Sequence, residues 1–305
     1  MIKKLFILSS AAGKKDFDSF EKEIIDCYKK NNRLDELEIV KTKSKKDLED
    51  SCIKFLNTDF PNFDKKTIYA CGGDGSLNEI ANIIASSKNK AGLGLIPMGT
   101  ANDFSKNFDY SNFSLEDTFE PELSKIDLIK INDRYSINIF STGFDAKVLD
   151  QALRLLDKYP RLSSFAYALA VLKIIFKIKA SKLKISFLDE NASKIEKENS
   201  YIFATVCNGS YYGSGFNPAP DAKIDDGFLN LLLVDDANLL NIIPLIRKYK
   251  KGSHLTSKYV NYYLVKSGQI SSDEEMLINI DGYIIKDKNI NFEIAEAALD
   301  FHIIK

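Results

Sequence analysis

The pattern of apolar residues changes once along this chain of 305 residues, near residue 126, and this change limits the folds open to it. Before that point, short apolar runs alternate with segments whose apolar residues recur every three or four positions, as in parallel strands joined by helices. After it, runs rich in Ile, Leu, Phe and Tyr follow one another with turn residues between them, as in an antiparallel sandwich. We therefore expect an α/β domain with a parallel sheet over residues 1–126 and a β-sandwich over residues 127–291. Residues 292–305 are a candidate to complete the first domain.

The same patterns give the expected elements. In the first half, the strands are Lys4–Ser9, Glu36–Lys41, Thr67–Cys71 and Gly92–Ile96, and the helices are Phe17–Lys30, Lys45–Asn57 and Leu77–Ser86. In the second half, helices are expected at Ser163–Lys179 and Leu239–Lys250. The first residues resemble a signal peptide, but their apolar run, Leu5–Leu8, is short for one. We interpret it as a strand that enters a small-residue turn.

Composition excludes several classes of protein. The formal net charge is −1, so no overall field attracts nucleic acid, and we expect no nucleic-acid partner. The four cysteines form no CxxC pair, which argues against a disulfide framework or a zinc ribbon and fits a reducing cytosol. With only two histidines, a Ser-His-Asp triad or a His-rich metal site is not expected. No run of about 18 uncharged apolar residues predicts a membrane span.

The segment CGGDGSLNE, residues 71–79, is a glycine-rich turn between an expected strand and an expected helix. Ser76 and Glu79 have the spacing of a capping box. Free amides at a helix start, together with the freedom of glycine to adopt positive φ, form a site that binds anions. The alternative is a tight capped turn that binds nothing, and the segment matches neither standard nucleotide fingerprint.

The segment PMGTANDF, residues 97–104, repeats this arrangement after the next strand. Here Thr100 is expected to cap a short helix together with Asp103. Because the carboxyl ends of parallel strands meet at one edge of a sheet, the two turns predict a site for a phosphate-containing ligand. Asp74 and Asp103 would hold magnesium or accept a proton from an attacking hydroxyl. No P-loop lysine or arginine accompanies the turns, so charge neutralisation would come from magnesium and backbone dipoles.

Together these motifs resemble the diacylglycerol kinase catalytic family, especially its bacterial soluble lipid kinases, and are similar to sphingosine kinases. The family pattern GGDGTxNE is Gly72–Glu79 here, with Ser76 for Thr, and PxGTxNDF is Pro97–Phe104. Further matches are Asp127 in IDL, Asp145 in STGFDA, and residues 207–234. NAD kinases and phosphofructokinases share the GGDG turn and the expected fold, but the second half of the chain favours lipid kinases.

The resemblance implies ATP and Mg²⁺ as cofactors and assigns the following residues. The nucleotide would contact Thr42, Gly72, Gly73, Asp74, Gly75, Ser76, Asn78, Glu79, Gly99, Thr100 and Asn102. Catalytic roles would fall to Asp74, Asp103, Asp127 and Asp281. In the turn KIDDGF, the carbonyls of Lys223 and Phe228 and the carboxylate of Asp226 would bind magnesium, although a polar turn without an ion is the alternative.

One position departs from the family. Its members have Asp-Gly-Glu near the C-terminus, and the glutamate is commonly assigned as the proton acceptor. Here Asp281 and Gly282 are kept, but Tyr283 replaces the acid. A phenol with a pKa near 10 is a poor base at neutral pH. Asp281 or Asp74 takes this role, or the protein is a weak or inactive kinase.

The resemblance also implies a lipid substrate, bound by the sandwich domain in a cleft between the domains. The apolar segment at residues 161–184 carries Lys173, Lys177 and Lys179, and is either a helix packed on the sandwich or an interfacial helix that meets anionic lipid. A second basic patch lies at residues 247–259. We expect a cytoplasmic protein that is peripheral to the inner face of the membrane. The sequence does not fix an oligomeric state, and a homodimer is one alternative.

The sequence therefore predicts an ATP-dependent lipid kinase that phosphorylates a hydroxyl of diacylglycerol or a related lipid. Two alternatives stay open. One is a lipid- or nucleotide-binding homologue that has lost catalysis, and the other is an NAD-kinase-like enzyme acting on a soluble substrate.

Overall fold

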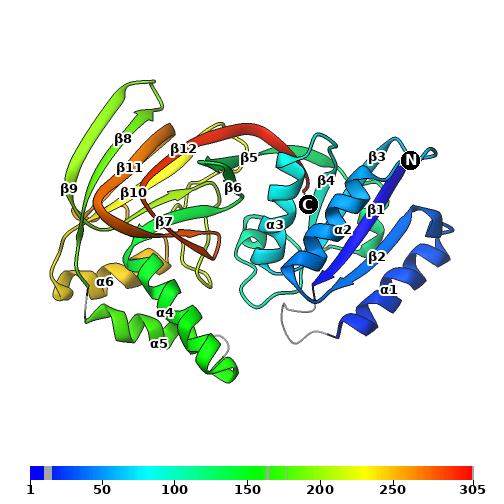
Figure 1. Ribbon diagram of the computed structural model, residues 1–305, viewed down its shortest axis with the longest axis horizontal. Coiled ribbons are helices and arrows are strands. Elements are labelled where there is room, and N and C mark those ends of the chain that lie inside the picture. Colours follow the sequence, from blue (N-terminus) through cyan, green and yellow to red (C-terminus); the bar gives the residue numbers. More distant parts are fainter. Residues whose placement is uncertain (10–15, 163–164, 177, 304–305) are drawn as a thin grey trace. The chain divides into compact units, whose positions relative to one another are not determined.

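The computed structural model describes residues 1–9, 16–162, 165–176 and 178–303, which form two compact units (Figure 1). Unit 1 comprises Met1–Asp127 and Glu296–Lys305, and unit 2 comprises Leu128–Ala295. Strands β5 (Leu123–Ile131) and β12 (Tyr283–His302) carry the chain from unit 1 to unit 2 and back.

Unit 1 is an α/β unit with a parallel sheet in the order β4-β3-β1-β2. The end of β12 adds to β4, also in parallel, through Phe301 and Leu93. Its strands are β1 (Ile2–Ser9), β2 (Leu37–Thr42), β3 (Lys65–Gly72) and β4 (Gly92–Pro97). Its helices are α1 (Phe17–Lys30), α2 (Lys45–Asn57) and α3 (Asp74–Ser86), with 3₁₀ turns η1 (Leu34–Glu36), η2 (Phe104–Asn107) and η3 (Leu115–Thr118).

Local sequence explains these elements and the edge at which they meet. Asp16 caps α1 by accepting hydrogen bonds from the amides of Asp18 and Ser19, and the Ser44 hydroxyl caps α2. On one face of the sheet, α1 packs its buried Ile24 and Tyr28 against apolar side chains of β1 and β3. Because the four strands are parallel, their carboxyl ends lie at one edge, which is the edge where both glycine turns begin.

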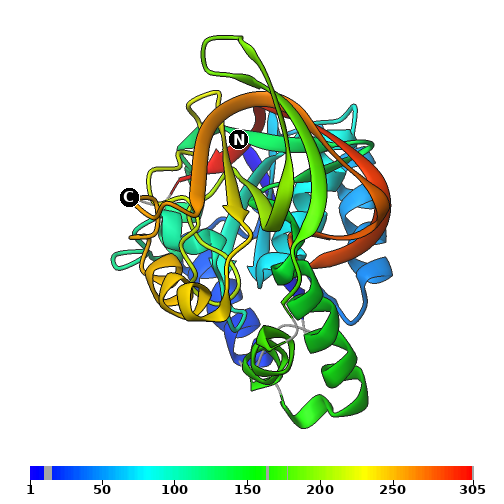
Figure 2. The same ribbon diagram turned by 90° about the vertical axis from the view of Figure 1, so that its left-hand side faces the viewer.

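Unit 2 is an antiparallel β-sandwich with three helices. Its strands are β6 (Arg134–Ser136), β7 (Ile139–Gly143), β8 (Ser181–Asp189), β9 (Lys194–Cys207), β10 (Leu229–Asp235) and β11 (Val260–Ile280). Its helices are α4 (Phe144–Lys158), α5 (Phe165–Ile175) and α6 (Leu239–Lys250), with a 3₁₀ turn η4 (Pro160–Leu162). Strand β11 pairs with β7, β8, β10 and β12, so it closes the sandwich around one apolar core. The three helices lie together on one side of these strands (Figures 1 and 2).

The predicted fold class is confirmed, including the boundaries of α1, α2 and α6. Helix α4, which contains Asp145 of the motif STGFDA, was not predicted from the sequence. Gly143, at φ 101°, starts this helix, and a Cβ there would lie 2.4 Å from the carbonyl oxygen of Ile202. The helix expected at Ser163–Lys179 is α5, and Ser163, Ser164 and Lys177 lie outside the described residues, as does the small-residue turn expected after β1. No described helix is long and apolar enough to cross a membrane.

Candidate functional site

The two glycine turns of unit 1 are in direct backbone contact. The carbonyl of Gly72 accepts hydrogen bonds from the amides of Met98 and Gly99, at 2.9 and 3.0 Å. A Cβ on Gly99 would lie only 2.5 Å from the Cα of Gly73. Glycine is therefore required for this approach, and the turns predicted to share one edge do share it.

Asp74 joins the two turns. Its carboxylate accepts hydrogen bonds from the amides of Asp103 and Phe104, both at 3.0 Å, so it caps the 3₁₀ turn η2 from another part of the chain. Burial raises the pKa of Asp74, and these two backbone hydrogen bonds oppose the rise. Asp74 therefore belongs to the first turn and also holds the backbone of the second turn.

Both capping boxes predicted from sequence are wrong. Helix α3 begins at Asp74 with Gly73 as its N-cap and no side-chain cap, so Ser76 lies inside the helix. The turn η2 begins at Phe104, after Asp103 rather than Thr100, and has no side-chain cap from its own N-cap residue. The spacing rule failed because Asp74, which is distant in sequence, satisfies the η2 amides.

Each turn also brings a lysine that the sequence analysis did not find. Lys45, the first residue of α2, places Nζ at 2.9 Å from Oε1 of Glu79. At the second turn, Lys106 forms an ion pair with the carboxylate of Asp103. Neither lysine belongs to a P-loop pattern, and Lys45 reaches its turn from a neighbouring helix, so spacing around the motif could not reveal it.

Unpaired polar atoms test whether the edge fits a nucleotide. The hydroxyl of Ser9, at the end of β1, is buried and has no hydrogen-bond partner among the described residues, and its side chain lies beside Gly72. Asn102, at φ 46°, donates through Nδ2 to the carbonyl of Gly99, whereas its buried Oδ1 has no partner in the part of the chain that the structure describes. A hydroxyl donor and an amide oxygen suit a phosphate and a ribose, respectively. Next to Gly75, no atom of the described residues lies within 4 Å of the position a Cβ would take, which leaves space at the turn.

Among the other predicted contacts, Thr42 at the end of β2 and Asn78 in α3 are buried. Because β2 is parallel to β1, Thr42 lies at the same edge of the sheet as the two turns. The buried Asp127 accepts a hydrogen bond from the amide of Ala297 at 2.7 Å and so ties β5 to β12. Its catalytic role stays a prediction.

In unit 2, Asp281 is half-buried, and its carboxylate accepts four hydrogen bonds. It accepts hydrogen bonds from the hydroxyl of Ser136 at 2.7 Å and from the amides of Ile137, Asn138 and Ile139 at 2.8 to 3.3 Å. Burial raises its pKa to about 6 although these donors lower it. This carboxylate therefore organises the segment between β6 and β7, which is a positioning role.

Tyr283, at the position of the family's glutamate, is half exposed at the start of β12. The guanidinium carbon of Arg134 lies 4.9 Å from the centre of its ring, which is a cation–π contact. The position therefore carries an aromatic ring beside a cation, where the family pattern has an anion.

An apolar pocket lies in unit 2 between the helices and the sheet. Its walls come from α4, α5, α6, β9, β10 and the connection after β9, with Tyr167, Phe203, Phe216 and Leu245 among them. Asp145 lines this pocket, is buried, and accepts a hydrogen bond from the Ser141 hydroxyl. Burial raises the pKa of Asp145 to about 6.

Comparison with known proteins agrees with this geometry. The family model described as the diacylglycerol kinase catalytic domain matches residues 3–131. The model described as the YegS C-terminal NAD kinase beta sandwich-like domain matches residues 138–302. A diacylglycerol kinase of Staphylococcus saprophyticus subsp. saprophyticus is 32% identical over 219 residues, which is 70% of this chain and 69% of that protein. The chain belongs to the diacylglycerol kinase family.

Other members give the same result. A diacylglycerol kinase of Staphylococcus haemolyticus is 32% identical over 223 residues, or 72% of this chain and 65% of that protein. A crystal structure of a putative diacylglycerol kinase from Bacillus anthracis str. Sterne has a TM-score of 0.74 and 22% identity, covering 99% of this chain and 97% of that one. At this identity the structure supports the fold alone. The family resemblance read from the motifs is confirmed.

The turn expected to bind magnesium is exposed and folded on itself. The carboxylate of Asp226 accepts a hydrogen bond from the amide of Phe228 at 3.0 Å. Oxygen donors on an exposed turn fit a hard cation. Among the described residues, including this turn, no three His, Cys, Asp or Glu side chains gather as metal ligands.

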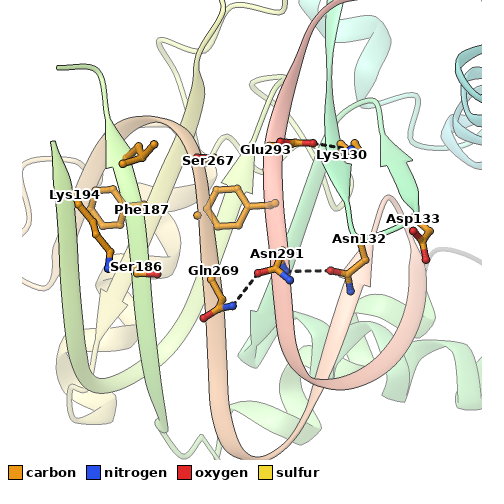
Figure 3. A pocket seen from close by; sticks show the side chains of 13 residues that line it. Lys130, Asn132, Asp133, Ser186, Phe187, Lys194, Ser267, Gln269, Asn291 and Glu293 are labelled. Carbon is orange, nitrogen blue, oxygen red and sulfur yellow. Dashed lines mark hydrogen bonds and ion pairs between the residues drawn. The ribbon is translucent and has the colours of Figure 1, made fainter. Parts of the chain in front are cut away.

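A polar groove lies on the outer face of β8, β11 and β12 (Figure 3). There Gln269 donates to Asn291 at 2.8 Å, and Lys130 pairs with Glu293 at 2.7 Å. The described residues that line this groove include none of the predicted site residues. Because these side chains satisfy one another on a solvated sheet face, we assign the groove no ligand.

Proposed function

We propose that this protein is an ATP-dependent lipid kinase, which transfers the γ-phosphoryl group of ATP to a hydroxyl of diacylglycerol or a related lipid. Family membership supports the reaction class. The observation that supports nucleotide binding is the contact between the glycine turns. Asp74 fixes this contact by accepting hydrogen bonds from the amides of Asp103 and Phe104.

The nucleotide would lie along the carboxyl edge of the unit 1 sheet. The amides at the start of α3 and the space beside Gly75 would receive phosphate groups. The unpaired hydroxyl of Ser9 would donate to a phosphate oxygen, and the unpaired Oδ1 of Asn102 would accept from a ribose hydroxyl. Thr42 would contact the nucleotide at the end of β2.

Mg²⁺, when bound, would neutralise charge that develops on the phosphate oxygens. Asp74 and Asp103 would organise nucleotide and metal at the turns. A further ion would bind the exposed turn through Asp226 and the carbonyls of Lys223 and Phe228. In the assay below, Asp226→Ala is expected to require more Mg²⁺ for half-maximal rate, with Asp225→Ala as the neighbouring exposed control. Identical Mg²⁺ titrations would remove this site from the proposal.

The lipid hydroxyl must lose a proton, and the family's acid is absent at Tyr283. Asp74 is our candidate acceptor, because it lies at the turns proposed to hold the phosphate groups. Burial also raises the pKa of its carboxyl. Asp281 is less suited, since four donors occupy its carboxylate. Asp127 would support the site by holding β5 to β12.

The apolar pocket of unit 2 would receive an acyl chain of the lipid. Its walls are largely apolar, and Asp145 is an acceptor for a polar group of the substrate. Loss of one base need not abolish phosphoryl transfer, which depends mainly on positioning and electrostatics. Tyr283 nevertheless favours a second candidate function, which is a binding homologue with impaired catalysis.

A labelled-ATP assay tests these two functions. Purified protein would be given γ-labelled ATP, Mg²⁺ and separate lipids: diacylglycerol, phosphatidylglycerol, a sphingoid base and a polyprenol. We expect labelled lipid from the wild type, and a rate about tenfold or more higher from Tyr283→Glu, which restores a carboxylate. Labelled lipid from Tyr283→Glu alone would instead favour the impaired homologue.

We further propose that unit 2 meets the membrane surface through α5. Phe165 and Leu172 of this helix, and Phe176 directly after its last residue, are 73%, 61% and 73% exposed in spite of their size. They recur at a helical spacing, opposite the buried Ala166 and Ala170. Such a stripe, with Lys173 beside it, is typical of an interfacial helix.

Vesicle co-sedimentation tests this contact. The triple variant Phe165→Ser/Leu172→Ser/Phe176→Ser is expected to bind vesicles of phosphatidylglycerol and phosphatidylcholine at least about tenfold more weakly, because each side chain would bury apolar surface in the lipid. Leu34→Ser/Ile53→Ser, which changes two exposed apolar residues of unit 1, is the matched control. Equal binding by the triple variant and the control would exclude α5 as the membrane contact.

A further inference from the structure

The glycine turns contain an apparent electrostatic conflict. Asp74, Glu79 and Asp103 are three acids close to where the proposed function puts a polyphosphate. Like charges at short range repel, and more strongly where water is excluded. Two of these acids are also poorly solvated, because the side chains of Glu79 and Asp103 are only 14% and 6% exposed. Such acids need a nearby cation.

The structure supplies one cation to each turn. Lys45 lies with Nζ at 2.9 Å from the carboxylate of Glu79, and Lys106 pairs with the carboxylate of Asp103. Both lysine side chains remain partly exposed, at 39% and 36%, so a ligand in solvent can reach them. The same arrangement, in which a motif acid holds a lysine, thus occurs at both turns.

We propose that Lys45 and Lys106 bind the phosphate groups of the nucleotide, and that Glu79 and Asp103 are positioning residues that hold the two ammonium groups at the turns. The inference deepens the proposed function and rests on it for the identity of the ligand. An ammonium has three donors, so it can contact a carboxylate and a phosphate oxygen together. The lysines would then supply the positive charge that a P-loop lysine supplies elsewhere.

A purely structural interpretation gives a different expectation. Ion pairs at partly exposed sites contribute little to stability, so removing either lysine would change folding slightly and ligand binding not at all. If a lysine contacts phosphate, its removal would weaken ligand binding in proportion to the charge of the ligand. The two interpretations therefore separate when ligands of different charge are compared.

The test is direct nucleotide binding in the absence of lipid, by titration calorimetry with ATP, ADP and adenosine in Mg²⁺ buffer. Lys45→Met and Lys106→Met are each expected to lower ATP affinity about tenfold, ADP affinity less, and adenosine affinity not at all. Lys45→Arg should restore most of the ATP affinity. Lys46→Met, which changes the exposed neighbouring residue of α2, is the control and should bind as the wild type does.

Equal losses for ATP and adenosine, or unchanged ATP affinity in both methionine variants, would overturn the inference. These outcomes are separate from failure of the proposed function. Wild-type protein that binds ATP with the expected lysine dependence but labels no lipid would refute the kinase and leave the lysine assignment standing. If the wild type labels lipid but both methionine variants bind ATP as tightly as the wild type, the lysine assignment is refuted and the proposed kinase function stands.

Discussion

Gly99→Ala is expected to reduce lipid phosphorylation by about 100-fold or more. The new Cβ would lie 2.5 Å from the Cα of Gly73 and 2.7 Å from Oδ1 of Asn102, whereas carbon atoms pack at about 3.5–4.0 Å. The first of these neighbours is backbone and cannot rotate away, so the turns must separate by about 1 Å. A displacement of this size at a reacting site costs about 100-fold in rate. Overpacking should also lower the free energy of unfolding by about 1–3 kcal/mol.

Gly75→Ala is the matched variant in the same motif. In the part of the chain that the structure describes, no atom lies within 4 Å of the Cβ position at Gly75. The substitution should therefore leave the free energy of unfolding unchanged or slightly higher, since it adds a better helix former to α3. Its methyl group would instead enter the space proposed for phosphate and weaken ATP binding. Urea unfolding and ATP titration of both variants measure the difference. Full stability and full activity in Gly99→Ala would contradict the contact between the turns as the basis of the site.

Much of the fold could be predicted from the sequence, because local patterns of apolar and capping residues determine most of its helices and strands. Helix α1 was predicted with its boundaries because its apolar residues follow a helical period and Asp16 precedes them as a cap. Helix α4 was missed although Val148, Ala152 and other buried residues follow the same period. Its start depends on Gly143 and on the nearby carbonyl of Ile202, which is a contact between distant segments.

The candidate site was only partly accessible for a related reason. Motifs located the two turns, but the partners of their side chains are distant in sequence. Asp74 bonds the amides of Asp103 and Phe104, and Lys45 reaches Glu79 from another helix. Spacing rules describe neighbours along the chain, so they assigned Glu79 and Asp103 to capping boxes that the structure does not contain.

The substitution at Tyr283 has a consequence for the division of roles between carboxylates. Asp281 keeps its position in the Asp-Gly turn because it holds three amides and a hydroxyl, which a base role would not explain. The hairpin can therefore fold with or without a following acid. Under the proposed function, the role of proton acceptor would pass to Asp74 in unit 1, whose pKa burial raises.

Asp74→Ala and Asp74→Asn are expected to inactivate the kinase for different reasons. Alanine removes both acceptors and leaves the amides of Asp103 and Phe104 unpaired, at about 1–3 kcal/mol for each buried donor. The second turn would lose its position along with stability. Asparagine keeps one side-chain oxygen, so its cost to folding should be about 1–2 kcal/mol, while loss of the charged acceptor should lower the rate by about 10²–10⁴.

Urea unfolding and initial rates of lipid labelling, measured on both variants, separate the cap from the charge. Asp109→Ala is the control, because Asp109 is an exposed carboxylate on the same connection and should leave the rate unchanged. An asparagine variant that turns over at the wild-type rate would mean that the charge of Asp74 takes no part in the reaction. An alanine variant as stable as the wild type would contradict its role as the cap of η2. If both losses appear, one carboxylate joins the turns and serves the chemistry, which explains why an acid occupies a turn built for anions.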